Sequence, residues 1–297
     1  MELNHQAIET PVRDASTVVL LRDAPAGLEV FLMKRSGLSD VLGGAYVFPG
    51  GKLDAADAID DMPNRLDQSP QALHAALNEP ALQHHNAAAL YVAALREAFE
   101  ESGVLFAENA NLAVSDKTTA LAAELLKNGQ SFPAILAQLG LRLQTQHVQP
   151  WSRWITPKLA SVSTKRFDTR FFIAAVPHHQ TAVHDNFETT ESVWLAPRAA
   201  LEEYWSGGIS LAPPQIMSLA HLSHHRTVAS ALAEARSKPP AVIEPEPFEF
   251  EGLRTITYPG DAQHSIRERA LPGPTRLCFR NKRFEPLNGF EALFLKT

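Results

Sequence analysis

The chain has 297 residues, of which 45% are hydrophobic and 20% are charged, with a net charge of −6 and one cysteine. This length suits one large domain or two small ones, and the apolar fraction excludes an intrinsically disordered chain. The single cysteine excludes an internal disulfide and a cysteine-rich zinc fold, and the acidic balance argues against a general nucleic-acid or membrane-surface binder.

The N-terminal part is predicted to hold two strands and a glycine-rich loop. Apolar or β-branched runs at 16–21 and 29–34 flank the turn sequence RDAPAG, which indicates a strand pair. Residues 35–54 contain five glycines and one proline, so we expect a loop with a short strand at AYVF. Short helices are expected around 55–61 and 70–77.

The strongest helix prediction covers residues 86–102, NAAALYVAALREAFEES. Asn86 is a suitable N-terminal cap, and Gly103 stands where a C-terminal cap residue belongs. Two further helices are expected, over 115–127 and 131–140.

The second half of the chain is predicted to alternate strands and helices. Strands are expected at 151–156 and 169–176, a strand end followed by a helix over 193–205, and one longer helix over 214–236. Residues 238–252 contain four prolines and are expected to form a linker or an extended arm. Two or three short strands are expected after them.

No sequence feature predicts membrane insertion or export. The first ten residues, MELNHQAIET, lack the apolar core of a secretory signal. The longest apolar runs, such as 171–176, fall far short of the ~20 residues that a membrane span needs. We therefore expect a cytoplasmic protein.

Three carboxylates in the helix at 86–102 carry the sharpest chemical signal. Glu97, Glu100 and Glu101 stand at i, i+3 and i+4, so they share one helix face. Their mutual repulsion would be offset by a hard divalent cation, which prefers oxygen ligands. Arg96 lies four residues before Glu100 and can pair with it. From this spacing alone, a solvated acidic helix end is the alternative.

A glycine pair upstream adds context to the acidic helix. Phe48-Pro49-Gly50-Gly51-Lys52 follows an apolar run, and glycines let backbone carbonyls approach a ligand or metal closely. An ordinary turn is the alternative.

Together these segments resemble the Nudix box, G-x5-E-x7-R-E-U-x-E-E-x-G-U, in which U is apolar. Gly51 opens the pattern, Asp57 replaces its first Glu, and residues 96–104 match its second half. The spacer between Asp57 and Arg96 has 38 residues in place of seven. The insertion of 31 residues that splits the box is similar to that of the peroxisomal coenzyme A diphosphatase branch of the Nudix hydrolases.

The resemblance implies an α/β fold, namely a Nudix α/β/α sandwich with a mixed β-sheet and extra helices. We expect a Nudix hydrolase domain over 1–236, interrupted by an insertion at about 58–88. Residues 237–297 are expected to form a C-terminal extension, which either packs on the same domain or forms the arm of a homodimer.

A second signature bears on the substrate. Nudix coenzyme A hydrolases carry L-L-T-x-R-[S/A]-x3-R-x3-G-x3-F-P-G-G before the box. This sequence keeps the spacing, but Met33 replaces the Thr and Asp40 replaces the second Arg. Arg35 matches the first Arg, and its planar guanidinium suits phosphate oxygens. Pairing of Arg35 with a carboxylate such as Asp40 is the alternative.

The resemblance also implies the cofactor. We expect Mg²⁺ or Mn²⁺ to be held by Glu97, Glu100, Glu101 and a carbonyl near Gly50 or Gly51. Such a cation would neutralise a diphosphate and lower the pKa of a bound water that attacks phosphorus.

Other residues complete the expected site. Lys52 or Arg35 would stabilise the developing charge, and Phe48 is expected to line the substrate site. Arg166 and Arg170 precede an apolar strand, where they either balance an anionic substrate or hold the sheet edge.

A further catalytic carboxylate is expected in the loop that contains Glu188 and Glu191. Of the two, Glu191 is preferred, as a metal ligand or general base. The expected catalytic residues are therefore Arg96, the three helix glutamates and Glu191. A solvated loop glutamate is the alternative. His221 and His225 share a helical face but do not form H-E-x-x-H, so surface histidines are expected, and Cys278 is expected in or near the core.

These features predict metal-dependent hydrolysis of a nucleoside diphosphate linked to another moiety. The preferred substrate is coenzyme A or acyl-CoA, cleaved to 3′,5′-ADP and (acyl-)4′-phosphopantetheine. ADP-ribose, NADH, a dinucleoside polyphosphate or a capped RNA end are alternatives, because the second Arg of the signature is missing. A non-catalytic nucleotide sensor is an alternative of another class, although clustered carboxylates disfavour it. The expected partner is a small molecule, without nucleic acid or membrane.

Overall fold

The computed structural model describes residues 3–4, 6–38, 42–59, 61–109, 112–160, 165–185 and 189–296. Asp40 and Glu188, to which the sequence assigns possible roles, lie outside these ranges. Among the described residues, none of the helices combines the length and the hydrophobicity that crossing a membrane requires.

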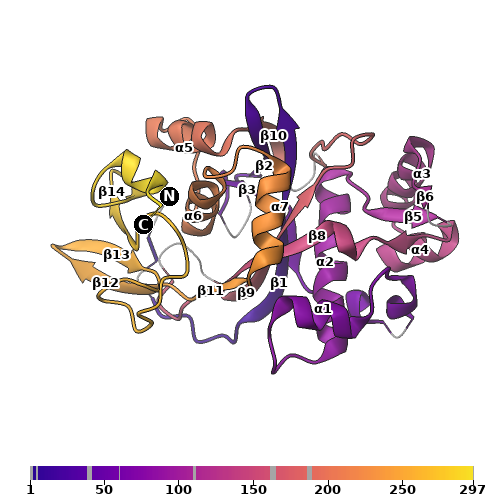
Figure 1. The fold of residues 1–297 in the computed structure, drawn as a ribbon, viewed down its shortest axis with the longest axis horizontal. Coiled ribbons are helices and arrows are strands. Elements are labelled where there is room, and N and C mark those ends of the chain that lie inside the picture. The colour runs from indigo at the N-terminus through magenta and orange to yellow at the C-terminus, as the bar shows by residue number, and fades with distance from the viewer. Residues whose placement is uncertain are drawn as a thin grey trace.

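A mixed sheet lies at the centre of the molecule (Figure 1). Its strands are β1 (Arg13–Ala24), β2 (Gly27–Arg35), β3 (Tyr46–Val47), β4 (Gly50–Lys52), β8 (Val148–Ile155), β9 (Phe167–Ala175), β10 (Thr189–Leu195) and β11 (Ala241–Ile243). The order is β10-β2-β1-β9-β8-β11, with β3 beside β2 and β4 beside β1. β1 is parallel to β9 and antiparallel to β2 and β4.

Helices cover both faces of this sheet (Figure 1). They are α1 (Pro70–Leu77), α2 (His84–Ser102), α3 (Asp116–Lys127), α4 (Phe132–Leu139), α5 (Pro197–Ser206), α6 (Pro213–Leu222) and α7 (Val228–Ser237). Short 3-10 helices are η1 (Ala55–Ala58), η2 (Met62–Arg65), η3 (Thr145–His147) and η4 (Phe290–Phe294). Two small sheets contain β5 (Ala107–Asn109), β6 (Leu112–Ala113) and β7 (Arg142–Leu143), and β12 (Glu246–Phe250), β13 (Leu253–Thr257), β14 (Arg276–Arg280) and β15 (Arg283–Glu285).

Alternation along the central strands divides the apolar core into two layers. Val18 and Leu20 of β1 pack in one cluster with α1–α4, whereas Val19 and Leu21 pack in the other with α5–α7. Successive side chains of a strand point to opposite faces, so the continuous apolar runs of the sequence fill both layers. The result is the expected α/β/α sandwich.

The acidic helix is longer than predicted. α2 begins at His84 after Gln83, and Asn86 lies inside it and does not cap it. The C-terminal prediction is confirmed, because Gly103 has φ +72° and its N–H donates to the Phe99 carbonyl. Ser16 Oγ donates to the Leu90 carbonyl at 2.7 Å, which joins α2 to the sheet.

The predicted helix over 214–236 is two helices, and the predicted linker over 238–252 is mostly strand. The Thr227 hydroxyl caps a new helix by accepting the Ser230 N–H, so the chain turns between α6 and α7. β11 pairs with the main sheet and β12 with β13. Both are edge strands, where prolines are tolerated because one side of the strand needs no donors.

The C-terminal residues pack on the same core as the helices before them. Tyr258, Leu277, Phe284 and Leu293 belong to the cluster that contains α5–α7. The Tyr204 hydroxyl of α5 accepts the Phe284 N–H at 2.8 Å and donates to the Phe284 carbonyl at 3.0 Å. Cys278 is fully buried, as expected from the sequence.

A buried ionic network anchors the insertion to the sheet. Glu79, just after α1, accepts two hydrogen bonds from Arg170 of β9, at 2.9 and 2.6 Å. Arg153 of β8 also pairs with Glu79, at 2.9 Å, and with Asp168 at 2.6 Å. Arg170 is 3% exposed and also pairs with Asp14. It therefore has the sheet-holding role that the sequence left open.

Replacement of Glu79 by Ala is expected to lower the free energy of unfolding by about 3 kcal/mol, because the buried Arg170 and the partly buried Arg153 lose a shared partner. Urea denaturation measures the change. The control is Glu9→Ala, which removes an exposed partner 3.9 Å from Lys158 and should cost less than about 1 kcal/mol. Equal losses in the two variants would contradict the anchoring role.

Candidate active site

The C-terminal half of α2 presents an arginine between two glutamates. Arg96 Nη1 donates to Glu97 Oε1 at 2.8 Å and to Glu100 Oε2 at 2.9 Å. The second contact is the i,i+4 pair that the sequence predicts. Arg96 and Glu97 side chains are 11% and 12% exposed, so the pair is largely removed from solvent.

Asp57 brings the two halves of the split motif together. Arg96 Nε donates to Asp57 Oδ1 at 2.8 Å and Nη2 donates to Oδ2 at 3.0 Å. Asp57 is 1% exposed and accepts the Asp54 N–H, which completes the reciprocal cap of η1. We did not predict this pairing, and its signal was the position of Asp57 at the first acidic place of the box.

The glycine pair fits directly against the acidic helix. Gly50 N–H donates to Glu101 Oε2 at 2.7 Å. A Cβ at Gly51 would lie 2.3 Å from Glu97 Oε1, which is closer than nonbonded atoms approach. The sequence predicted a loop over residues 50–52, but they form the strand β4. The pairing of β4 with β1 fixes the two glycines beside Glu97 and Glu101.

Burial places an electrostatic cost on these carboxylates. Desolvation raises the pKa of Glu97 to about 7, although Arg96 opposes the shift. Burial also raises the pKa of Glu100, again opposed by Arg96. Burial disfavours the charge of Arg96, but its ion pairs with Asp57 and the two glutamates raise its pKa overall, so it remains a cation.

The donor set fits a hard divalent cation. Glu97, Glu100 and Glu101 provide carboxylate oxygens, and Arg96 is the only cation recorded in salt bridges with the first two among the described residues. Mg²⁺ and Mn²⁺ prefer oxygen ligands, and the absence of a side chain at Gly51 lets the Glu97 carboxylate lie directly against β4. These residues can hold such an ion and thereby offset the repulsion.

A cavity of about 730 Å³ opens onto this cluster. Its lining includes Arg96 and the three helix glutamates together with the substrate-site residues Arg35, Phe48 and Lys52. The sequence thus predicted residues that share one cavity.

The rest of the cavity lining is largely apolar. Its apolar members are contributed by β8, β9, the start of α6 and the C-terminal residues, and include Trp154, Phe171, Pro213, Pro245 and Ile256. Lys165 also lines the cavity. Sequence reasoning missed these residues, because no motif or spacing links the C-terminal residues to the acidic helix.

Two predicted residues do not line this cavity. Arg166 Nε donates to the Thr156 carbonyl at 2.9 Å, and its Nη2 lies 4.0 Å from Glu244. Glu191 on β10 is 55% exposed in its side chain and lies 3.5 Å from Lys34 Nζ. The structure therefore does not bring Arg166 or Glu191 together with the acidic cluster.

Comparison with known proteins gives a consistent result. The family model described as the NUDT19 Nudix domain matches residues 12–222. A Xenopus laevis protein named acyl-coenzyme A diphosphatase NUDT19 is 31% identical over 66% of this chain and 60% of its own length. The human protein of that name is 29% identical over 70% of this chain and 64% of its own. The chain thus matches less than two thirds of these relatives.

A solved structure shares the fold. The crystal structure of a Nudix hydrolase from Alicyclobacillus acidocaldarius is 27% identical, with a TM-score of 0.60. The match covers 76% of this chain and 97% of that protein.

Glu97→Gln is expected to stabilise the metal-free protein at pH 8 by about 1–3 kcal/mol, since each unit of pKa shift corresponds to about 1.4 kcal/mol. The raised pKa means that folding opposes ionisation of Glu97. The gain should therefore be absent below pH 4.5 and grow as the pH rises to about 7. Urea denaturation with a chelator across this range measures it.

The matched control for this prediction is Glu124→Gln, at an exposed position of α3, which should show no such pH-dependent gain. A Glu97→Gln protein that is less stable than the parent at every pH would contradict the buried-charge interpretation.

Proposed function

The chain belongs to the Nudix hydrolase family, and from this premise we propose that it is a metal-dependent diphosphatase that cleaves coenzyme A or acyl-CoA. One observation carries the proposal: the carboxylates organised by Arg96 open into a cavity that also has cationic and apolar linings. The carboxylates can hold the cation that diphosphate cleavage requires, and the cationic side chains can bind the phosphates. The apolar lining suits a pantetheine or acyl chain.

The reaction follows from the charge of the diphosphate. When bound, Mg²⁺ or Mn²⁺ supplies charge neutralisation and lowers the pKa of a water molecule. Water adds to one phosphorus, the bridging P–O bond breaks, and the products are 3′,5′-ADP and (acyl-)4′-phosphopantetheine. In the chain itself, Arg96 holds Glu97 and Glu100 in place, and the absence of a side chain at Gly51 lets the Glu97 carboxylate lie against β4.

Cationic side chains are suited to the phosphates. Arg35 and Lys52 line the cavity beside the acidic cluster, where they can bind phosphate oxygens and stabilise charge that develops in the transition state. Lys165 is a further cation in the same lining.

The apolar lining favours a thioester or thiol arm over a second nucleotide. The Trp154 ring packs edge to face with Tyr258 and the Phe171 ring with Phe48, and the Trp154 and Phe171 rings contact each other at a tilt, so this wall is preorganised. Relatives named acyl-coenzyme A diphosphatase support the same substrate class. ADP-ribose, NADH and dinucleoside polyphosphates are the second candidates, since Asp40 replaces the second Arg of the coenzyme A signature.

We expect the purified chain with Mg²⁺ or Mn²⁺ to release 3′,5′-ADP from coenzyme A faster than it cleaves other diphosphates, as measured by product mass. Glu100→Gln or Glu101→Gln should lower this rate by about a hundredfold or more, because the site loses a carboxylate ligand for the cation that would neutralise the diphosphate. Glu124→Gln is the control and should retain full activity.

The outcomes of this experiment separate the alternatives. If ADP-ribose or NADH is cleaved faster than coenzyme A, that compound and not coenzyme A is the substrate. Near-normal turnover of Glu100→Gln on every diphosphate would reject the site, and binding without turnover under any metal would indicate a sensor.

Ile256→Ala should raise KM for a long-chain acyl-CoA by about tenfold, because apolar contact of a few methylene groups is lost. Free coenzyme A should be affected much less. Val242→Ala is the control, since Val242 is 47% exposed on the edge strand β11. An equal change of KM for both substrates would argue against an acyl-binding role of this wall.

A further inference from the structure

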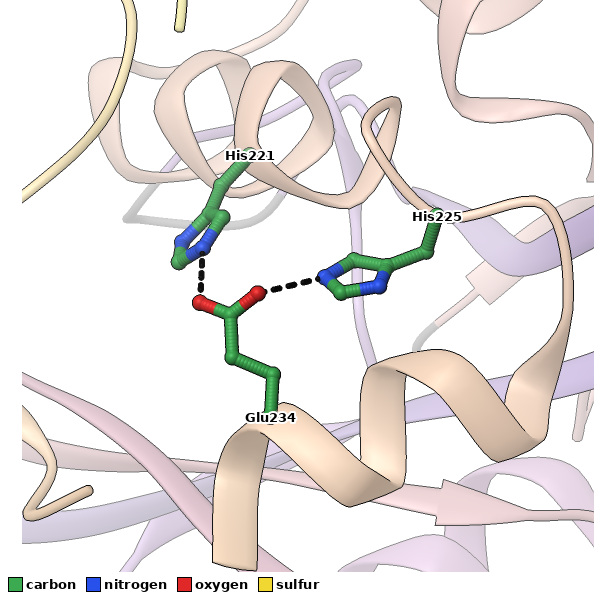
Figure 2. Close-up of side chains that lie close together, drawn as sticks. All are labelled: His221, His225 and Glu234. Carbon is green, nitrogen blue, oxygen red and sulfur yellow. Dashed lines mark hydrogen bonds and ion pairs between the residues drawn. The ribbon is translucent and has the colours of Figure 1, made fainter. Parts of the chain in front are cut away.

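Three side chains from α6, the turn after it and α7 converge (Figure 2), and none of them is among the residues that line the cavity. His221 Nε2 lies 2.8 Å from Glu234 Oε1, and His225 Nε2 lies 2.9 Å from Glu234 Oε2. One ligand atom from each residue lies within 4.8 Å of the other two. The helix break that separates α6 from α7 allows His225 to turn toward Glu234, which a continuous helix would not.

The two imidazole rings are held in place from behind. His225 Nδ1 lies 2.7 Å from the Ser230 hydroxyl, and the Trp151 ring lies 4.4 Å from the His221 ring and 6.1 Å from the His225 ring. A hydrogen bond to the second ring nitrogen, such as that of His225 Nδ1, fixes the orientation of histidines that bind metals, whereas the buried His221 Nδ1 has no hydrogen-bond partner within the part of the chain that the structure describes.

This cluster is buried, and one of its nitrogen atoms, His225 Nε2, lacks a well-formed hydrogen bond among the described residues. The His221 and His225 side chains are only 6% and 7% exposed. Within the part of the chain that the structure describes, the buried His225 Nε2 makes no hydrogen bond of proper geometry, although it faces Glu234 as an ion pair. A buried imidazole nitrogen that faces a carboxylate at this distance can coordinate the same metal ion as the carboxylate.

We propose that His221, His225 and Glu234 form a binding site for a transition-metal dication, with Zn²⁺ as the best fit. Two imidazole nitrogens and one carboxylate are a set that Zn²⁺ accepts, with water in the fourth position. This set differs from the all-oxygen cluster on α2. Zinc–ligand distances of about 2.1 Å place tetrahedral donors about 3.4 Å apart, which lies between the observed imidazole–carboxylate distances of 2.8 and 2.9 Å and the 4.8 Å within which one donor atom of each residue lies.

The protonation states suit this role. Burial lowers the pKa of both histidines, so they are neutral at neutral pH. The hydrogen bond from His221 Nε2–H lowers the pKa of Glu234, which is therefore ionised, and cation binding by His221 Nε2 requires its other neutral tautomer, with the proton on Nδ1. With Nε2 free to bind, the Nδ1–H of His225 donates to the Ser230 hydroxyl.

Lys238 is the internal competitor for the site. Its Nζ lies 2.5 Å from Glu234 Oε1, where it occupies a ligand oxygen. The Lys238 side chain is 51% exposed, so it can swing into solvent at little cost. A bound cation would cross-link α7 to α6, whose first residues, Pro213–Gln215, line the cavity.

The experiment uses the full chain, stripped of metal and then saturated with Mg²⁺ to occupy the oxygen cluster. Zn²⁺ is titrated by calorimetry and Co²⁺ by visible absorption. We expect one tight equivalent of Zn²⁺, a rise in Tm, and the strong visible band of four-coordinate Co²⁺. Ser230→Ala should weaken binding by about tenfold, and Lys238→Ala should tighten it.

Two sets of variants decide the outcome. Glu234→Gln keeps the side-chain shape but removes the ligand charge, and His221→Ala removes a nitrogen ligand. Each should lose the Zn²⁺ equivalent and the Co²⁺ band while circular dichroism shows a folded chain. If one of them does not fold, the other carries the test. The control is the double change His178→Ala/His179→Ala at an exposed pair, which should bind normally.

Absence of tight Zn²⁺ binding in the parent chain, or its persistence in folded Glu234→Gln, would overturn the proposal and leave these residues as a hydrogen-bonded link between helices. Loss of the equivalent in the His178/His179 control would also overturn it, since the ion would then be held at the surface. Because binding and Tm are the readouts, failure here is distinguishable from failure of the proposed hydrolase activity.

Discussion

One guanidinium group organises the acidic end of the molecule. Arg96 contacts Asp57, Glu97 and Glu100 at 2.8 to 3.0 Å, so a single buried cation orients three carboxylates that would otherwise repel one another. Its bidentate contact with Asp57 also closes the gap that the insertion opens in the motif. A lysine could not do this, since only the planar fork reaches several acceptors in fixed directions. The position of Glu97 beside Gly51, and hence the proposed metal site, depends on the ion pair between Arg96 and Glu97.

The same principle attaches the insertion. Glu79 lies between Arg170 and Arg153 on neighbouring strands, so a segment absent from a compact Nudix box is bound to the centre of the sheet. Buried ion pairs add little net stability compared with apolar contacts, but removal of one partner is costly. This favours one defined position of the insertion, with α1 packed against α2, over a loosely attached loop.

The cavity is assembled from distant parts of the chain. Its carboxylates come from α2, its aromatic wall from β8 and β9, and its further apolar residues from the start of α6 and from Pro245 and Ile256. The C-terminal residues therefore contribute to the candidate site as well as to the core. The start of α6 lies at the cavity, and the break after its last residue lets His225 turn toward Glu234 of α7.

Local patterns determined much of this protein. The residues of α1, the acidic face and C-terminus of α2, the Arg96–Glu100 pair and the central strands follow from periodicity, spacing and caps, which act within a few residues. Tertiary structure alone decided the Asp57–Arg96 and Glu79–Arg170 pairs, the strands formed by 241–250, and the break that replaced one predicted helix by two. Residues 223–227 at that break, SHHRT, have no apolar side chain, and the Thr227 hydroxyl caps a new helix where the prediction continued the first one. Contacts between distant residues depend on how strands pair and layers pack, and no local spacing encodes that arrangement.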